Sequence, residues 1–411
     1  MSFNFSENCS AIINESKVVL GNRETGHWIR ISKEVYDILN LGIENKDSID
    51  ELKLKLYDEE DRNYVGNLYS KLLYMEVIAQ NNTKNILKNK IASFEITHRC
   101  NLKCIHCCVD ADGVVSNKKD LKTSDIKLIL DKLIDWNPQR IMLSGGEPML
   151  RSDFIEILTY LKDRYDGEIT LSTNGTLFNK NNVDIISKYI HQVDVSLDGV
   201  DEETCSIIRG TGVFDKVINN IKLLQSTGFS KIAVSMATAD KNEYLEERFI
   251  ELNKNIGTKP LIRQFSAVGR GKDNKQYFTD AKENEAYIPQ TFLSDDYDSA
   301  IGMCSCNAGQ RELFIGYNGD IYPCPSFIQK NFKIGNILND DKFFTLNKDI
   351  RSYKLLERYN LNQFEKCEKC KVNLFCWTCP GSIEELKDRP GAIEDRCNKM
   401  KPVLYKRVWE R

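Results

Sequence analysis

Three cysteines lie close together on one short stretch of the chain, at Cys100, Cys104 and Cys107. Their CxxxCxxC spacing lets three thiolates reach a single metal centre from one loop. A four-iron four-sulfur cluster takes four ligands, so a loop that supplies three leaves one iron free for a small molecule. We therefore predict a cluster with an open coordination site. The alternative is an accidental grouping in a cysteine-rich chain.

Most of the 14 cysteines fall into two groups. The first is completed by Cys108, and the second consists of Cys304, Cys306, Cys324, Cys367, Cys370, Cys376, Cys379 and Cys397. The N-terminus has no export signal, so we expect a cytoplasmic protein whose thiols stay reduced and bind metal. A structural zinc site is an alternative for the CxxC pairs, but the second group has more thiols than one tetrahedral site takes.

The charge and hydropathy of the chain exclude two kinds of partner. A formal net charge of -3 over 411 residues, without a basic block, argues against nucleic acid. No apolar run approaches the roughly 18 residues of a membrane span. We expect neither a nucleic-acid nor a membrane partner.

Residues 90–270 alternate short apolar runs with amphipathic stretches, a pattern typical of parallel strands joined by helices. The predicted strands cover residues 92–97, 140–143, 168–172, 193–197, 231–236 and 261–265. Helices are expected to begin near Thr123, Ser152, Asn181, Val213 and Asn242. Six such units predict an α/β fold with a partial (β/α)6 TIM-like barrel, whose chemistry lies at the carboxyl ends of the strands.

Two smaller segments flank the predicted barrel. Residues 1–85 contain three short strands at 11–13, 17–20 and 28–31. Helices follow at 33–41, 48–57 and 61–78, and this order predicts a winged-helix-like domain. Residues 300–411 have few periodic runs and the second cysteine group, so we expect bound metal to hold them together. Residues 269–298 are expected to form a loop or linker.

The cysteines after the first strand and the Gly145-Gly146-Glu147-Pro148 turn after the second make the chain resemble the radical SAM enzymes. In that family the open iron chelates S-adenosylmethionine (SAM). One electron then cleaves SAM to a radical that abstracts hydrogen from the substrate. The resemblance implies that the first three cysteines hold this cluster. It also implies that SAM contacts His106, Gly145, Gly146, Glu147, Pro148, Thr173, Asn174, Ser196, Arg209 and Met236.

At one of these positions the residue departs from the family pattern, and at another the residue has an alternative role. His106 stands where an aromatic residue usually stacks on the adenine, and an imidazole can still stack there. Arg209 has the alternative of a plain surface charge. No general base is identified, although Arg263 and Asp320 are visible titratable candidates.

The second cysteine group resembles the SPASM extension, which holds two auxiliary 4Fe-4S clusters and would bring the total to three. By this resemblance Cys367, Cys370, Cys376 and Cys397 ligate one cluster. The other takes Cys306, Cys324 and Cys379, and its fourth ligand is either Cys304 or an open position for a substrate thiolate. Only two residues separate Cys376 from Cys379, where the family usually has three.

The order of strands and helices in residues 1–85 is similar to the PqqD-like recognition element of enzymes that modify ribosomally made peptides. The resemblance implies a precursor peptide whose leader adds as a strand to the small sheet; an inert cap or a dimer contact is the alternative. We expect a peptide maturase that forms an intramolecular crosslink, preferably a thioether, and draws electrons from a flavodoxin or ferredoxin. Carbon–carbon or carbon–oxygen crosslinking, formylglycine-type oxidation and metal-stabilised peptide binding without chemistry are the alternatives.

Overall fold

The computed structural model describes residues 1–80, 90–111, 113, 119–294, 301–309, 311–339, 365–377 and 379–410. Contacts divide the chain into two compact units. The barrel unit comprises Leu87–Lys282 and Ala308–Leu356, and the terminal unit comprises Met1–Ile86, Glu283–Asn307 and Glu357–Arg411. The division into three domains remains a prediction.

No helix among the described residues has both the length and the apolar character needed to cross a bilayer.

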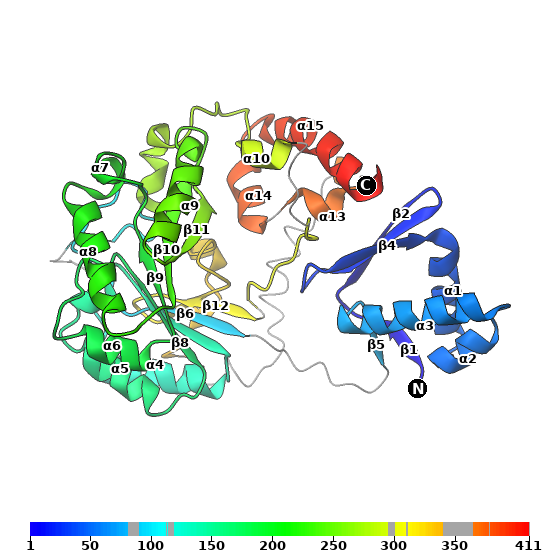
Figure 1. Cartoon of the computed structure of the whole chain (residues 1–411), viewed down its shortest axis with the longest axis horizontal. Coiled ribbons are helices and arrows are strands. Elements are labelled where there is room, and N and C mark those ends of the chain that lie inside the picture. Colours follow the sequence, from blue (N-terminus) through cyan, green and yellow to red (C-terminus); the bar gives the residue numbers. More distant parts are fainter. Residues whose placement is uncertain are drawn as a thin grey trace. The chain divides into compact units, whose positions relative to one another are not determined.

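Six parallel strands follow one another in chain order across the sheet of the barrel unit (Figure 1). They are β6 (Ile91–Glu95), β7 (Arg140–Ser144), β8 (Glu168–Thr173), β9 (Gln192–Ser196), β10 (Ile232–Thr238) and β11 (Lys259–Gln264). The connecting helices are α4 (Thr123–Asp135), α5 (Phe154–Lys162), α6 (Val183–Tyr189), α7 (Glu202–Arg209), α8 (Val213–Gln225) and α9 (Glu246–Asn255). The predicted α/β fold with a partial six-stranded barrel is confirmed.

Three further strands extend this sheet beyond β6. β12 (Glu312–Ile315) pairs with β6 in parallel, and β13 (Asp320–Tyr322) and β14 (Gly335–Asn336) follow in antiparallel order, giving nine strands. These strands were not predicted from the sequence, because each has at most four residues. Runs so short give no clear period-2 signal.

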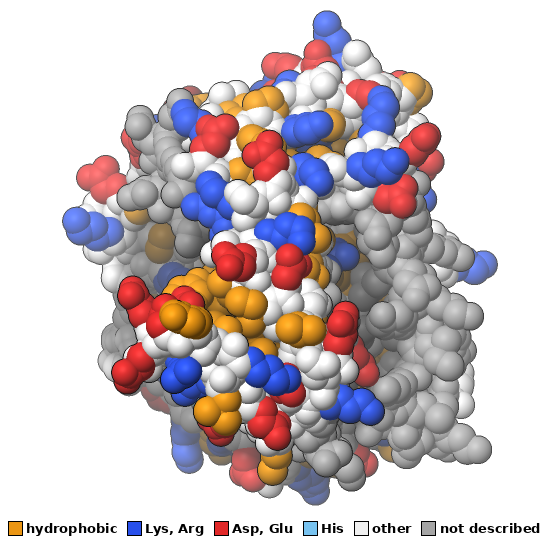
Figure 2. All heavy atoms as spheres, turned by 90° about the vertical axis from the view of Figure 1, so that its right-hand side faces the viewer, with side chains coloured by type: hydrophobic (Ala, Val, Ile, Leu, Met, Phe, Trp, Pro, Cys, Tyr) orange, Lys and Arg blue, Asp and Glu red, His pale blue; other side chains and the backbone are white. Residues whose placement is uncertain are grey.

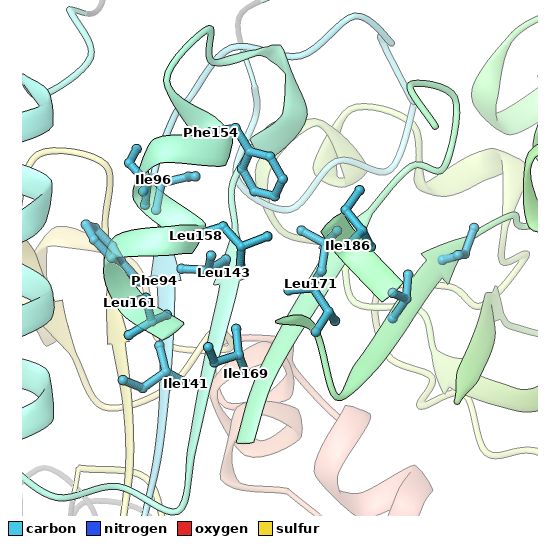
Figure 3. Packing of buried hydrophobic residues seen from close by; sticks show 14 of the residues in the cluster. Phe94, Ile96, Ile141, Leu143, Phe154, Leu158, Leu161, Ile169, Leu171 and Ile186 are labelled. Carbon is cyan, nitrogen blue, oxygen red and sulfur yellow. The ribbon is translucent and has the colours of Figure 1, made fainter. Parts of the chain in front are cut away.

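The two faces of the parallel strands differ in chemistry. Alternate residues such as Phe94, Leu143 and Leu171 are fully buried in one hydrophobic cluster with residues of the helices. Figure 3 shows Leu158 and Leu161 of α5 packed beside them. The intervening residues are largely polar, as in the run Ser93, Glu95 and Thr97 along and just past β6. Side chains that alternate across a strand lie on opposite faces, so the polar face points away from the helices and is available for chemistry.

The N-terminal part of the terminal unit contains three antiparallel strands followed by three helices, in the predicted order. The strands are β2 (Cys9–Asn14), β3 (Lys17–Asn22) and β4 (Trp28–Ser32), and the helices are α1 (Lys33–Glu44), α2 (Ile49–Leu54) and α3 (Glu59–Tyr74). The predicted extension of the last helix to Ile78 is wrong. After Tyr74 the chain turns and forms β5 (Ile78–Gln80), which pairs with β1 (Phe3–Phe5).

Both faces of β3 are covered within the terminal unit. Val18 and Leu20 belong to the hydrophobic cluster of α1–α3. Val19 faces the other way and packs with Met303 and with residues near the C-terminus, including Leu404 of α15 (Ala392–Tyr405). The outer surface of α1–α3 exposes apolar side chains among charged ones, as Figure 2 shows for this side of the molecule. The N-terminal sheet is therefore an integral layer of the terminal unit.

Candidate active site at the strand ends

The cysteine loop (residues 97–107) follows β6 at its carboxyl end. Cys100 and Cys104 are buried and Cys107 is half-buried. The backbone N–H groups of Leu102 and Ala111 approach the sulfurs of Cys100 and Cys107, each at 3.4 Å. Burial raises the pKa of the Cys100 thiol to about 11, and a bound cation would favour its thiolate. Buried thiols with N–H donors on their sulfurs suit an iron-sulfur cluster.

The turn after β7 is bound to the start of this loop by its backbone. The N–H groups of Gly146 and Glu147 donate to the carbonyl oxygens of Thr97 and Arg99, both at 2.8 Å. A Cβ atom on Gly145 would lie 2.4 Å from the Thr97 oxygen, and one on Gly146 would lie 2.2 Å from the Arg99 oxygen. Glycine is required here because a side chain would push the two strand ends apart.

Glu147 is fully buried behind this turn. Its carboxylate accepts hydrogen bonds from the Thr173 hydroxyl at 2.9 Å and from the Asn174 backbone N–H at 2.8 Å. Burial raises its pKa to about 7, although these hydrogen bonds oppose the shift. A ligand ammonium group would favour the ionised carboxylate. The structure therefore brings together three predicted site residues, namely Glu147 after β7 and Thr173 and Asn174 at the end of β8.

The Asn174 side chain links the end of β8 to the cysteine loop. Its amide nitrogen donates to the side-chain oxygen of Asn101 at 2.8 Å and lies 3.8 Å from the Cys100 sulfur. Its own amide oxygen accepts the backbone N–H of Thr176 at 2.9 Å. Asn174 therefore has a fixed position beside the first cysteine.

Asp198 joins two predicted site residues and was missed by the sequence analysis as a site residue. The Arg209 Nε donates to its carboxylate at 2.7 Å, and His106 Nε2 lies 2.9 Å from it. Burial favours a higher pKa for Asp198, but Arg209 and His106 outweigh it and hold the pKa well below its usual range. Arg209 also reaches the Cys104 sulfur at 3.6 Å. Its alternative as a surface charge is wrong, because it is 9% exposed.

His106 makes polar contacts as well as offering a ring for stacking. Its Nε2 is engaged by Asp198, while its Nδ1 is buried without a hydrogen-bond partner among the described residues. The ring centroid lies 5.7 Å from that of Phe278. A ligand beside His106 could therefore meet both a ring face and a nitrogen.

The only sequence signal for Asp198 was its place in the Asp198-Gly199 turn after the fourth predicted strand.

The remaining predicted contacts are divided between the two faces of the sheet. Ser196, at the end of β9, pairs in register with Ser235. Met236 is the next residue on β10 and is fully buried in the hydrophobic cluster with Val234. The structure does not bring Ser196 and Met236 together. Pro148 begins the short 3-10 helix Pro148–Leu150 behind the glycine turn.

A segment after β11 packs against the cysteine loop, and the sequence analysis treated it only as linker. The Arg270 backbone N–H donates to the Cys107 carbonyl at 3.0 Å, and its side chain donates to the Cys104 carbonyl at 3.1 Å. The same side chain reaches the Asp110 carboxylate at 2.7 Å. A Cβ on Gly269 would lie 2.3 Å from the Cys107 oxygen. These contacts hold the segment that begins at Gly269 against the cysteine loop.

The second cysteine group forms a separate cavity in the terminal unit. Four of its predicted ligands line a cavity of about 270 Å³, namely Cys367, Cys370, Cys376 and Cys397. In the described part of the chain, no three side chains of His, Cys, Asp or Glu converge on a point suited to a single metal ion. Four cysteine thiolates can ligate either a four-iron cluster or one tetrahedral zinc ion.

The other predicted auxiliary ligands lie in both units. Cys304, Cys306 and Cys379 belong to the terminal unit, and Cys379 precedes the helix α14 (Pro380–Leu386). Cys324 belongs to the barrel unit. Whether the four thiols share one cluster stays a prediction.

Comparison with known families agrees with the expected resemblance. Residues 94–252 match the Radical SAM superfamily, and residues 304–371 match SPASM, an iron-sulfur cluster-binding domain. The chain is therefore similar to radical SAM domains over its barrel strands and to SPASM domains over the segment that begins at Cys304.

Two characterised proteins are similar in sequence. The antilisterial bacteriocin subtilosin biosynthesis protein AlbA of Bacillus subtilis is 28% identical over 70% of this chain and 66% of its own length. The mycofactocin maturase MftC of Mycolicibacterium smegmatis is 28% identical over 61% of this chain and 68% of its own length. The chain spans about two thirds of each relative.

Solved structures share the fold at low sequence identity. Streptococcus suis SuiB bound to the precursor peptide SuiA aligns with a TM-score of 0.54 and 16% identity, over 96% of this chain and 99% of SuiB. The AdoMet-bound anSMEcpe aligns with a TM-score of 0.55 and 15% identity, over 78% of this chain and 97% of its own. These likenesses confirm the fold class.

A Gly269→Ala substitution tests the contact between the segment after β11 and the cysteine loop. The new methyl group collides with the Cys107 carbonyl, so we expect the variant to lose about one cluster, or roughly four irons per chain. Iron and sulfide are measured after anaerobic reconstitution. Gly228→Ala is the matched control, because Gly228 also has a positive φ but no atom within 4 Å of a Cβ. Equal iron in both variants would contradict the role of this contact.

An Asp198→Asn substitution tests the charge that holds Arg209 and His106. It leaves the buried Arg209 without its counter-charge, and we expect a loss of about 3–5 kcal/mol in the free energy of unfolding. The control is Asp201→Asn, because asparagine still caps α7 and the Asp201–Arg248 pair is exposed, at 40% and 57%. We expect the control to lose less than about 1 kcal/mol. Equal losses in anaerobic denaturant titrations would show that Asp198 has no special role.

Proposed function

We propose that this radical SAM enzyme takes a hydrogen atom from a ribosomally made precursor peptide and closes an intramolecular crosslink, preferably a thioether. The observation that carries the proposal is that the chain has two cysteine sites. One is the three-cysteine loop at the strand ends, and the other is the cavity lined by four cysteines. The names of AlbA and MftC, and the SuiB structure with its precursor peptide, support a peptide substrate.

The site at the strand ends suits SAM and its cluster. Cys100, Cys104 and Cys107 would hold three irons, and bound SAM would supply the radical that abstracts hydrogen. The buried Glu147 would accept the methionine ammonium group, whose positive charge offsets the cost of ionising a buried carboxylate. Thr173 and Asn174 already hold that carboxylate in position. Ser196 and Met236 remain proposed contacts of the ribose and adenosine.

The auxiliary cysteines would hold clusters that can accept the electron released in the reaction. Closing a sulfur–carbon bond removes one hydrogen atom, one proton and one electron from the peptide. The SAM-derived radical would take the hydrogen atom, solvent would take the proton, and an auxiliary cluster would take the electron. Cys367, Cys370, Cys376 and Cys397 would hold one such cluster. Cys306, Cys324 and Cys379, with Cys304, would hold the other, for three clusters in all.

The N-terminal sheet supports the proposed recognition of a leader peptide. Within the described residues β4 pairs only with β3, so its other edge has no strand partner. A peptide that adds there as a strand would satisfy the free backbone groups. An electron donor such as a flavodoxin or ferredoxin would reduce the first cluster, in a cytoplasm that keeps the thiols reduced.

Other oxidations of a peptide remain alternatives. Carbon–carbon and carbon–oxygen crosslinks need the same removal of electrons, and only the product separates them from a thioether. Formylglycine-type oxidation is less well supported, because Pro325 follows Cys324 where those enzymes are expected to place an aspartate base.

The proposal is tested with the reduced, reconstituted enzyme, SAM and the precursor peptide encoded beside its gene. We expect 5'-deoxyadenosine and a peptide lighter by two hydrogens for each crosslink, with one fewer alkylatable cysteine for each thioether. Replacing Cys100, Cys104 and Cys107 together by alanine removes the cluster ligands, so both products should be lost. Cys9→Ala is the control, because Cys9 lies in β2 outside both cysteine groups.

Each component of the proposal has its own contrary result. A peptide of unchanged mass despite 5'-deoxyadenosine formation would contradict this peptide as substrate. A lighter peptide with all its cysteines still alkylatable would exclude the thioether and favour a carbon–carbon or carbon–oxygen bond.

A further inference from the structure

Arg396 is a buried cation beside the four-cysteine cavity of the terminal unit. It lies on α15, one residue before the predicted ligand Cys397, and is 7% exposed. Its guanidinium donates to the Cys376 carbonyl at 2.7 Å and lies over the Trp377 ring, 4.6 Å from the ring centroid. Cys376, Trp377 and Cys397 all line the cavity. Arg396 therefore contacts two residues of the cavity wall and adjoins a third in the chain.

The positive charge of Arg396 has no carboxylate partner among the described residues. The two acidic residues that precede it in α15 pair elsewhere, Glu394 with Lys366 at 3.2 Å and Asp395 with Lys399 at 2.7 Å. The Arg396 Nε is buried and has no hydrogen-bond partner in the described part of the chain. Burying a charge is costly unless it is paired, so an anion beside Arg396 would stabilise this arrangement.

The wall of the cavity has the same sign of charge. Lys366 and Lys401 line it, and none of the described lining residues is acidic. The groups on this wall that can become anionic are the four cysteine thiols. A cluster held by four thiolates carries a net negative charge, on which its reduction potential depends. Such a cluster would compensate Arg396, whereas four protonated thiols would not.

We propose that Arg396 is the buried counter-charge of an iron-sulfur cluster in this cavity and raises the reduction potential of that cluster. The inference rests on the proposed function, because it requires the four cysteines to hold a cluster. Uptake of one electron makes the cluster more negative, and a nearby cation stabilises this reduced state. The cluster is then a better acceptor for the electron that closure of the crosslink releases.

The test uses the full chain in a background without the first cluster, made by replacing three cysteines with alanine: Cys100, Cys104 and Cys107. Arg396→Gln and Arg396→Lys are compared there with the control Arg407→Gln. Arg407 is similarly buried, at 9% exposed, and donates to the Ser294 carbonyl at 2.6 Å, outside the cavity wall. Redox titrations followed by electron paramagnetic resonance (EPR) give the potentials. Iron, sulfide and zinc analyses give the bound metal.

We expect Arg396→Gln to move one auxiliary cluster to a more negative potential, because the compensating charge is lost. If this variant instead loses about four irons, Arg396→Lys should retain them, because it keeps the charge. Arg407→Gln should match the parent in both measurements. Equal potentials and iron contents for Arg396→Gln and Arg407→Gln would overturn the inference. Equal changes in Arg396→Gln and Arg396→Lys would also overturn it, because the shape of the side chain and not its charge would then be responsible.

A further variant separates this inference from the assignment of the cluster itself. Replacing Cys367 and Cys370 by alanine in the same background should remove about four irons if these cysteines hold a cluster. Unchanged iron in that variant, or zinc in place of iron in the parent, would refute the auxiliary cluster in this cavity, and the redox role of Arg396 with it. Loss of that iron together with an Arg396→Gln variant that matches the parent would refute the role of Arg396 alone.

Discussion

The close backbone contact between the cysteine loop and the end of β7 is the constraint on which the rest of the site depends. Two N–H groups of the glycine turn donate to carbonyl oxygens of the loop, and the glycines leave no room for a side chain. The contact fixes where the loop leaves the sheet. It also places the buried Glu147 beside Thr173 and Asn174, and Asn174 in turn beside Cys100. One close approach thus relates the thiols to the carboxylate proposed to bind the cofactor.

Electrostatics complements this geometry. The thiols of Cys100 and Cys104 are buried, and nearby positive charge favours their thiolates by offsetting the loss of hydration. Arg209 reaches one of the sulfurs and Arg270 a carbonyl beside it, and both lower the pKa of Cys104 against the effect of burial. Asp198 balances Arg209, so the site holds a cation without leaving it unpaired.

The sequence predicted the elements whose signal is local. The six parallel strands have clear apolar periodicity. The cysteine loop, Glu147 and Asn174 follow the carboxyl ends of three of them, and Arg209 is the last residue of α7. The short strands β12–β14 lacked such periodicity. Asp198 and Arg270 were not predicted as site residues, because the partners His106 and the cysteine loop lie far from them in the sequence. Met236 stays a proposed contact of the adenosine, and its motif position did not reveal that it lies on the apolar face of β10.

The central claim is that three thiols leave one iron free to bind SAM. It is tested most directly by the EPR spectrum of the reduced cluster, recorded with and without SAM, in a protein that keeps Cys100, Cys104 and Cys107 but lacks the auxiliary ligands. Direct binding of SAM to the open iron should change the g values of the signal. A spectrum that does not change at saturating SAM would contradict the account.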